Sequence, residues 1–193
     1  MDYQLGILGG MGPQATLTFY QRILARTSAE CDQEHIPTLI WSDTQIPDRT
    51  AALLTGNAEQ VYERLRDGIF LLTRAECSVI AIPCNTSHYF VERLQSETEV
   101  PILNMIRETA KRCAELGWKR VGILATDGTV QMGLYQNECK RLGLVCLTPP
   151  DEIQSLVMSI IYDEIKRGET GSREKFAEID RVLHEMGCDG AIL

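Results

Sequence analysis

The chain has 193 residues, of which 44% are hydrophobic and 24% are charged, a composition typical of a folded globular protein. No apolar run approaches the ~20 residues that a membrane-spanning helix needs, and the first four residues lack the basic start of a secretory signal. The formal net charge of −8 argues against a general nucleic-acid-binding protein, although one local arginine can still bind a small anion.

The chain contains seven cysteines, and none of them forms a Cys-x-x-Cys pair. A disulfide framework or a zinc site would normally show closer pairing. The three histidines are scattered and there is no acidic cluster, so we predict no metal site. These observations favour a cytoplasmic protein whose thiols are mostly structural.

Apolar runs and helical spacing predict strands that alternate with helices along the chain. In chain order we expect a strand at residues 4–8, a helix at 16–25, a strand at 37–41, a helix at 58–74, a strand at 78–82, a helix at 87–96, a strand at 102–103, a helix at 108–116, a strand at 120–124, a helix at 132–142, a strand at 144–147, helices at 151–167 and 172–186, and a strand at 190–193. This order predicts an α/β fold built on parallel sheets. We expect two α/β domains, at residues 1–103 and 104–193.

Ligands of parallel sheets bind beyond the carboxyl ends of the strands. The segments to inspect are therefore residues 9–13, 42–49, 83–88 and 126–129. The glycine-rich segment matches a G-x-G-x-x-A pattern only imperfectly, and no acidic residue closes a strand about 20 residues later, so we interpret it as a tight turn and not as a dinucleotide site.

The chain also repeats itself weakly. Residues 6–12 resemble residues 122–128 at an offset of 116, and residues 77–82 resemble residues 188–193 at an offset of 111. Chance similarity between strands of one α/β protein explains the repeat about as well as duplication does. If the repeat is real, the position equivalent to Cys84 lies two residues beyond Leu193. Cys188 cannot readily replace the residue at that position, because it lies at the opposite end of its predicted strand. At ~3.3 Å per residue, that end is about 16 Å from the end where the equivalent of Cys84 would lie.

Cys84 follows a buried strand and opens a predicted helix, where Asn85, Thr86 and Ser87 can cap free amides. A thiol at a helix start has its thiolate stabilised, which suits a proton acceptor near neutral pH. A buried and inert cysteine is the competing interpretation. His88 could tune this environment, whereas His35 and His184 are expected on the surface.

Two cations could bind carboxylate groups. The guanidinium of Arg49 suits bidentate recognition of a carboxylate, and Lys166 could supply a second positive charge. Either could equally be a solvated surface charge, and Asp48 could pair with Arg49.

Four motifs in order resemble those of the aspartate/glutamate racemase family, and the resemblance covers essentially the whole chain. They are Gly9-Gly10-Met11-Gly12-Pro13, Ile46-Pro47-Asp48-Arg49-Thr50, Pro83-Cys84-Asn85-Thr86-Ser87-His88 and Ile165-Lys166-Arg167-Gly168. The resemblance implies two pseudo-symmetric α/β domains that face each other across a cleft, no cofactor, and two cysteines on opposite sides of the substrate. It also implies a homodimer, with Cys84 as one catalytic thiol. The substrate-binding residues that it implies are Met11, Gln45, Arg49, Asn85, Thr86, Thr126 and Lys166.

The second cysteine of the family lies in a Gly-Cys-Thr-Glu motif after a strand that resembles residues 189–193, and the sequence given stops before that motif. We therefore expect a longer natural chain, and we expect a 193-residue form to lose racemisation, retaining at most slow proton exchange.

The predicted activity is racemisation of a small dicarboxylic amino acid, aspartate more than glutamate, with no nucleic-acid or membrane partner. Hydantoin racemisation, maleate isomerisation, arylmalonate decarboxylation and non-catalytic amino-acid binding remain alternatives.

Overall fold

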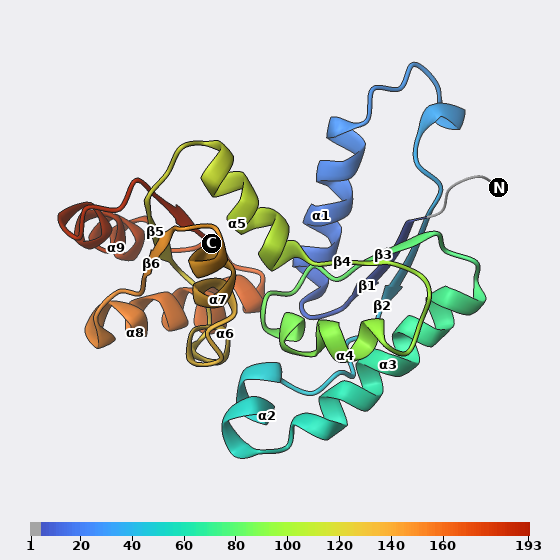
Figure 1. Cartoon of the computed structure of the whole chain (residues 1–193), viewed down its shortest axis with the longest axis horizontal. Helices are drawn as coiled ribbons and strands as arrows, with labels where there is room; N and C mark the ends of the chain where they lie inside the picture. Colours follow the sequence, from blue (N-terminus) through green and yellow to red (C-terminus); the bar gives the residue numbers. More distant parts are fainter. Residues whose placement is uncertain (1–4) are drawn as a thin grey trace. The chain divides into compact units, whose positions relative to one another are not determined.

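The computed structural model describes residues 5–193, and its internal contacts divide the chain into two compact units, Met1–Met105 and Ile106–Leu193 (Figure 1). Each unit contains its own parallel sheet flanked by helices. The predicted α/β class with parallel sheets is therefore confirmed. In the described part of the chain, no helix is both long enough and apolar enough to cross a membrane.

The sheet of the first unit has the strand order β2-β1-β3-β4. Its strands are β1 (Leu5–Gly9), β2 (Thr38–Ser42), β3 (Val79–Ala81) and β4 (Ile102–Leu103). The helices of this unit are α1 (Pro13–Arg26), η1 (Asp32–Glu34), α2 (Arg49–Thr55), α3 (Ala58–Arg74), η2 (Thr86–Phe90) and α4 (Val91–Gln95). The predicted strand positions are confirmed to within one or two residues, except for residue 4, which lies outside the described residues.

Helices cover both faces of this sheet, as the apolar composition of its central strands requires. On one face, Val61, Leu65, Ile69 and Leu72 of α3 are buried in a cluster with Leu8 and Ile80. Gly68 permits this packing, because a Cβ at that position would lie 2.6 Å from a methyl group of Leu8. The opposite face packs against apolar side chains of α1.

The sheet of the second unit has the order β6-β5-β7, from β5 (Arg120–Ile123), β6 (Val145–Leu147) and β7 (Gly190–Ile192). The helices are α5 (Met105–Glu115), α6 (Asp127–Gln131), α7 (Leu134–Arg141), α8 (Asp151–Ser159), the π-helix η3 (Ile160–Glu164), the 3-10 helix η4 (Ile165–Arg167) and α9 (Arg173–Glu185). Leu124, Ile153, Val157, Ile179 and Leu183 form a buried core under this sheet.

The order β6-β5-β7 repeats the order β2-β1-β3 of the first sheet, and one pair of strands in each sheet repeats in register. In the first unit, β1 pairs with β3 through Leu5↔Val79, Gly6↔Ile80 and Ile7↔Ala81. In the second unit, β5 pairs with β7 through Val121↔Gly190, Gly122↔Ala191 and Ile123↔Ile192. These pairs are related by the same offsets, 116 and 111, that the sequence suggests. The weak sequence repeat therefore corresponds to a structural repeat.

The repeat extends to the turns that lead into β3 and β7. The Cys77 amide donates to the Leu72 carbonyl, and the Cys188 amide donates to the Leu183 carbonyl, again at an offset of 111. Each turn contains one residue with positive φ, Glu76 at 59° and Gly187 at 71°. Glutamate thus occupies a left-handed position that its repeat partner fills with glycine.

We expect Glu76→Gly to raise the free energy of unfolding by about 0.5–1 kcal/mol, because glycine removes a left-handed strain that exceeds its own entropic cost. Gly187→Ala should lower that free energy by about 1–2 kcal/mol for the same reason. Urea unfolding measures both changes. A Glu76→Gly protein less stable than the parent would contradict this explanation.

Several predicted segments differ from the structure. The helix predicted at 132–142 begins two residues later, as α7, after Gly133 with its left-handed φ of 65°, and a short helix that was not predicted, α6, precedes it. The helix predicted at 151–167 changes to a π-helix at Ile160 and then to a 3-10 turn. The polar loop predicted at 42–49 ends where α2 begins, because Asp48 caps α2 by accepting from the Ala51 amide.

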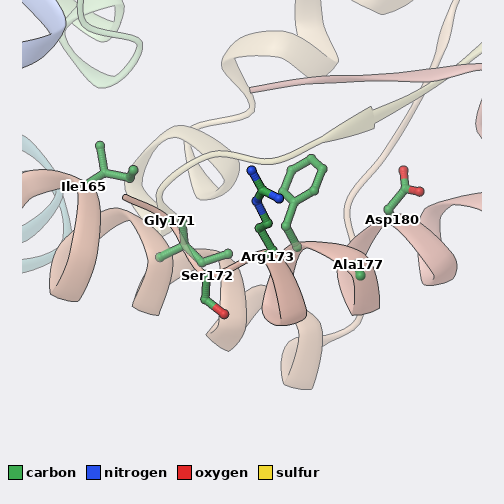
Figure 2. Close-up of a pocket in the computed structure, with 8 residues that line it drawn as sticks. Ile165, Gly171, Ser172, Arg173, Ala177 and Asp180 are labelled. Carbon is green, nitrogen blue, oxygen red and sulfur yellow. The ribbon is translucent and has the colours of Figure 1, made fainter. Parts of the chain in front are cut away.

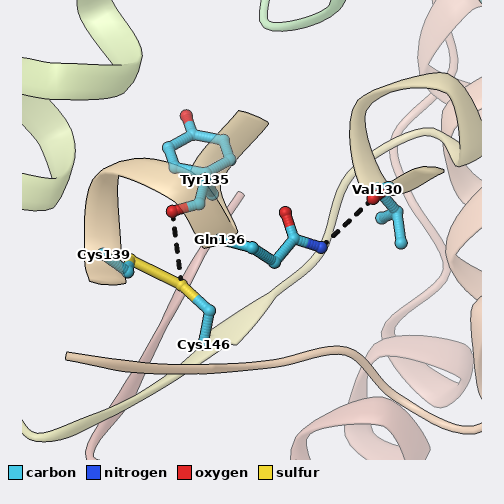
Figure 3. Close-up of a disulfide and its surroundings, with 5 residues drawn as sticks. All are labelled: Val130, Tyr135, Gln136, Cys139 and Cys146. Atoms are coloured by element: carbon cyan, nitrogen blue, oxygen red, sulfur yellow. Dashed lines mark hydrogen bonds between the residues drawn. A yellow bond between two sulfur atoms is a disulfide. The ribbon is translucent and has the colours of Figure 1, made fainter. Parts of the chain in front are cut away.

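The structure has one disulfide, whereas the sequence predicts no disulfide framework. Cys139 of α7 and Cys146 of β6 form a disulfide, seen in Figure 3 with the Gln136 amide that donates to the Val130 carbonyl. The other five cysteines, all among the described residues, are free. The paired residues lie seven apart, on either side of the turn at Gly143, which brings the end of α7 beside β6.

A hollow lies on α9, and the repeat relates its α9 residues to mostly buried positions of α3 (Figure 2). The α9 residues that line it are Arg173, Phe176, Ala177 and Asp180. At the offset of 111 they correspond to Tyr62, Leu65, Arg66 and Ile69 of α3. Of these, Tyr62, Leu65 and Ile69 are buried in the cluster that also contains Phe90, Val91 and Leu94 of η2 and α4. Phe176 and Ile165 are exposed in the second unit.

Candidate active site

Three polar segments meet at the carboxyl edge of the first unit's sheet. They are the turn Gly10–Gly12 after β1, the segment from Asp43 to Arg49 after β2, and the segment from Pro83 to His88 after β3. Hydrogen bonds join the first segment to both of the others. The sequence singled out the same three segments by the rule that ligands bind beyond strand ends.

The glycine turn is held by one threonine hydroxyl from α1. Thr16 Oγ1 accepts from the Gly10 amide at 2.9 Å and donates to the Gly12 carbonyl at 3.0 Å. Gly9 has no room for a side chain, because a Cβ there would overlap with Thr16. Gly10 has a φ of 91°, and a Cβ there would overlap with the main chain of Asp43. Both glycines are therefore required by close approach.

Asp43 packs against the glycine turn and is hydrogen-bonded to it. Its main-chain amide donates to the Gly9 carbonyl at 3.2 Å, and its buried carboxylate accepts from the Gln45 amide at 2.9 Å. The same carboxylate pairs with the half-exposed guanidinium of Arg64 at 2.7 Å. Gln45 itself is exposed, so the amide side chain that the resemblance assigns to substrate is available at the surface.

Arg49 is buried, with only 8% of its surface exposed. Its Nη1 donates to the carbonyls of Ile46 and Pro47 at 3.3 and 3.0 Å, and its Nη2 donates to the Met11 carbonyl at 3.0 Å. Among the described residues its Nε has no hydrogen-bond partner, and its acceptors are all carbonyls. The interpretation of Arg49 as a solvated surface charge is wrong, since the side chain ties the β2 segment to the glycine turn.

We expect Arg49→Met to lower the free energy of unfolding by about 2–4 kcal/mol, because buried carbonyls lose their donors. Urea unfolding measures this loss. Arg181→Met is the matched control, because it removes an exposed pair with Glu185 that contributes about 0–1 kcal/mol. Equal losses for the two variants would mean that the Arg49 hydrogen bonds contribute little.

Cys84 lies three residues after the end of β3 and is partly buried against the core of the first unit. Its amide donates to the Ile82 carbonyl at 2.8 Å, so that amide is not free for a ligand. The helix predicted at 87–96 begins instead as the 3-10 helix η2 at Thr86 and becomes α-helical only at Val91. The helix start predicted after Cys84 is therefore a short 3-10 turn, since η2 and α4 have five residues each.

The next two side chains tie the Cys84 segment to its neighbours. The buried Ser87 hydroxyl donates to the Met11 sulfur at 3.1 Å. His88 contacts the Cys84 carbonyl and the Met105 amide through its two ring nitrogens. Met11 thus contacts both Ser87 and Arg49. Neither the thioether contact nor the burial of Arg49 leaves a local sequence signal, because each joins residues far apart in the chain.

The remaining predicted residues of the first unit are Asn85, which is partly exposed, and Thr86, which is buried. They follow Cys84 directly, so their placement beside it was predictable from the sequence. Met11, Arg49, Cys84, Asn85 and Thr86 belong to the three segments that meet at this edge of the sheet.

Two predicted residues belong to the second unit. Thr126 precedes α6, and its hydroxyl lies 3.3 Å from that of Thr129. Lys166 lies in η4, with its Nζ 3.6 Å from the centre of the Tyr162 ring. Tyr162 lines a hollow together with Asp127 and Gln154. This hollow lies at the carboxyl edge of the second unit's sheet.

Two other free cysteines, Cys77 and Cys188, lie at the opposite ends of their strands from the position of Cys84. Cys77 and Cys188 lie at equivalent turns before β3 and β7, at the amino ends of those strands. Burial raises the pKa of both thiols. In the described residues, no group of three or more histidine, cysteine or acidic side chains is arranged to hold a metal ion.

Comparison with known proteins gives consistent matches. The family model described as Asp/Glu/Hydantoin racemase matches residues 8–193. The chain is 30% identical over 150 residues to the broad specificity amino-acid racemase RacX of Bacillus subtilis. The aligned part is 72% of this chain and 61% of that protein. It is 28% identical over 131 residues to a glutamate racemase of Limosilactobacillus reuteri, covering 67% of this chain and 47% of that protein. The chain thus spans less than two thirds of the length of these relatives.

Solved structures give the same result. The chain is similar to the aspartate racemase of Picrophilus torridus, with a TM-score of 0.83 and 31% identity over 100% of this chain and 80% of that one. It is also similar to an aspartate racemase homologue from Pyrococcus horikoshii, with a TM-score of 0.78 and 25% identity over 100% of this chain and 84% of that one.

Proposed function

The chain belongs to the Asp/Glu/hydantoin racemase family, and on this basis we propose that it racemises an acidic amino acid at the α-carbon without a cofactor. Aspartate is the preferred substrate in this proposal, and glutamate is the second. The similarity to the Picrophilus torridus aspartate racemase and the Ile46-Pro47-Asp48-Arg49-Thr50 motif both support aspartate.

The proposed chemistry moves one proton off the α-carbon and one proton onto its other face. The Cys84 thiolate takes the α-proton, and the bond electrons remain on the substrate as a carbanion. A second thiol, expected from the family resemblance, delivers a proton from the opposite face and becomes the thiolate. The two groups exchange roles for the other enantiomer, so no oxidant, reductant or cofactor is consumed.

The observation that carries the proposal is that the segments of Cys84 and of a buried cation, Arg49, meet at the same edge of the sheet through Met11. The thiol follows β3 at the carboxyl edge of the sheet, and the Arg49 guanidinium is held at the same edge through the Met11 carbonyl. A buried guanidinium whose acceptors are neutral carbonyls, and whose Nε is unpartnered in the described residues, favours a bound anion. A substrate carboxylate supplies that anion.

The other assignments follow the resemblance. Lys166 would bind a second carboxylate, which a dicarboxylic amino acid requires. Met11, Gln45, Asn85, Thr86 and Thr126 would contact the substrate through amides, hydroxyls and side-chain amides. We also propose a homodimer in the cytoplasm, acting on a small molecule and not on a nucleic acid or a membrane.

A second candidate is racemisation of several amino acids, as the name of the Bacillus subtilis relative states for that protein. The 30% identity to that relative over 150 residues supports it. Comparable rates for aspartate and for a neutral amino acid such as alanine would support this candidate over strict acidic specificity.

The test uses the full-length natural protein and follows the α-proton of L-aspartate and of L-glutamate by NMR in D₂O, with chiral chromatography for the D enantiomer. Deuterium at the α-carbon together with the D enantiomer is expected for a racemase. The proposal would be contradicted if neither amino acid exchanged its α-proton and neither gave its D enantiomer. Maleate isomerisation is tested alongside by the appearance of fumarate.

A further inference from the structure

His88 is buried next to Cys84, with 6% of its surface exposed. It lies four residues after Cys84, in η2. Its Nδ1 is 2.8 Å from the Cys84 carbonyl oxygen, and its Nε2 is 3.1 Å from the Met105 amide nitrogen. Both ring nitrogens of His88 are therefore occupied by main-chain groups.

The two partners define the protonation of the ring. A carbonyl oxygen can only accept and an amide can only donate, so Nδ1 carries the hydrogen and Nε2 is the acceptor. Burial lowers the pKa of His88 below its usual value, against the opposing effect of the Cys84 and Leu103 main-chain groups, and so favours the neutral ring. A neutral ring with both nitrogens engaged is suited to hold the main chain and not to carry a proton to substrate.

The hydrogen bonds of His88 join two strand ends. Cys84 follows β3, and Met105 follows the neighbouring strand β4 and begins α5. The Cys84 amide is already held by the Ile82 carbonyl at 2.8 Å. With the carbonyl held by His88 as well, the main chain on both sides of the Cys84 side chain is fixed.

We propose that His88 is a positioning residue that holds the Cys84 carbonyl and thereby fixes the thiol where it meets the α-carbon. This role rests on the proposed racemase function. A base in a proton transfer must reach its target within hydrogen-bond distance, and a displacement of about 1 Å costs about 10²-fold in rate. The Met105 hydrogen bond orients the ring, and the Cys84 hydrogen bond acts on the thiol.

Two substitutions separate these hydrogen bonds. In His88→Asn, the side-chain amide nitrogen replaces Nδ1 and can still donate to the Cys84 carbonyl. In His88→Gln, the longer side chain places its oxygen near Nε2, where it can accept from the Met105 amide, and leaves the Cys84 carbonyl without its donor. His88→Ala removes both bonds, and His184→Asn, at an exposed histidine of α9, is the matched control.

The kinetic measurement is kcat and KM for both enantiomers. We expect kcat to fall about 10²-fold in His88→Gln and His88→Ala, with KM nearly unchanged. His88→Asn should lose less than about tenfold, the equivalent of one neutral hydrogen bond. Thermal unfolding of each variant identifies losses that come from the fold, and His184→Asn should match the parent.

A second measurement does not depend on racemase activity. Alkylation of Cys84 by iodoacetamide, followed by mass spectrometry, reports how firmly the partly buried thiol is held, and the exposed thiol of Cys31 is the internal standard. We expect faster Cys84 alkylation in His88→Gln and His88→Ala and an unchanged rate in His88→Asn. Alkylation that follows this order in a full-length protein without racemase activity would keep the positioning role and refute the proposed function. Equal effects of Asn and Gln in both measurements, or an unchanged kcat in His88→Ala, would overturn the positioning role.

Discussion

Replacing Cys84 by serine should lower the rate of α-proton exchange by about 10²–10⁴-fold, the range that a positioned general base contributes. Serine keeps the size of the side chain, and its hydroxyl can occupy the same partly buried position against the core. The hydroxyl is a far weaker acid than the thiol, so it supplies almost no anionic base near neutral pH. The main-chain hydrogen bonds on either side of residue 84 do not involve the side chain and should remain.

The measurement is deuterium incorporation into L-aspartate, with thermal unfolding to establish that the variant is folded. Cys31→Ser is the matched control, because Cys31 is a free, exposed cysteine outside the site. It should exchange the α-proton at the parent rate. A Cys84→Ser protein that is as active as Cys31→Ser would exclude Cys84 as the base.

The fold was largely predictable because each sheet is assembled from local patterns. The helical spacing of Val61, Leu65, Ile69 and Leu72 predicts α3 from residue 58 to residue 74, and the structure has the same bounds. The repeat was detectable because equivalent strands must pair in the same register to bury equivalent residues. Where the predicted bounds fail, as at Gly133 and Ile160, the backbone changes conformation without a change in the apolar pattern.

The candidate site was predictable only in part. The segments that carry it follow the strands, so their meeting at one edge could be derived from the topology. The contacts between them join residues 38 apart for Arg49 and Met11, and 76 apart for Ser87 and Met11, so no local spacing encodes them. The start of α2 was predictable from Asp48, a residue type that favours the N-cap position. The burial of Arg49 was not, because it depends on a contact with Met11, 38 residues away.

The site therefore depends on the turn at Gly10 as much as on the residues with reactive groups. Asp43 packs against the turn from below, and its amide donates to Gly9. Met11 accepts from Arg49 and from Ser87 on the other side. A change in the turn should consequently displace the cation and the Cys84 segment together.

Gly10→Ala should lower the free energy of unfolding by about 2–5 kcal/mol, because a left-handed φ and a steric overlap act at the same residue. The added Cβ would overlap with main-chain atoms of Asp43, which cannot move without breaking the hydrogen bond to Gly9. Gly12→Ala is the matched control two residues away, with a φ of −106° and no atom within 4 Å of the added Cβ. It should change stability by less than about 0.5 kcal/mol. Urea unfolding measures both variants, and equal stabilities would mean that the turn can shift away from Asp43, so that close packing under the turn does not hold Met11 in place.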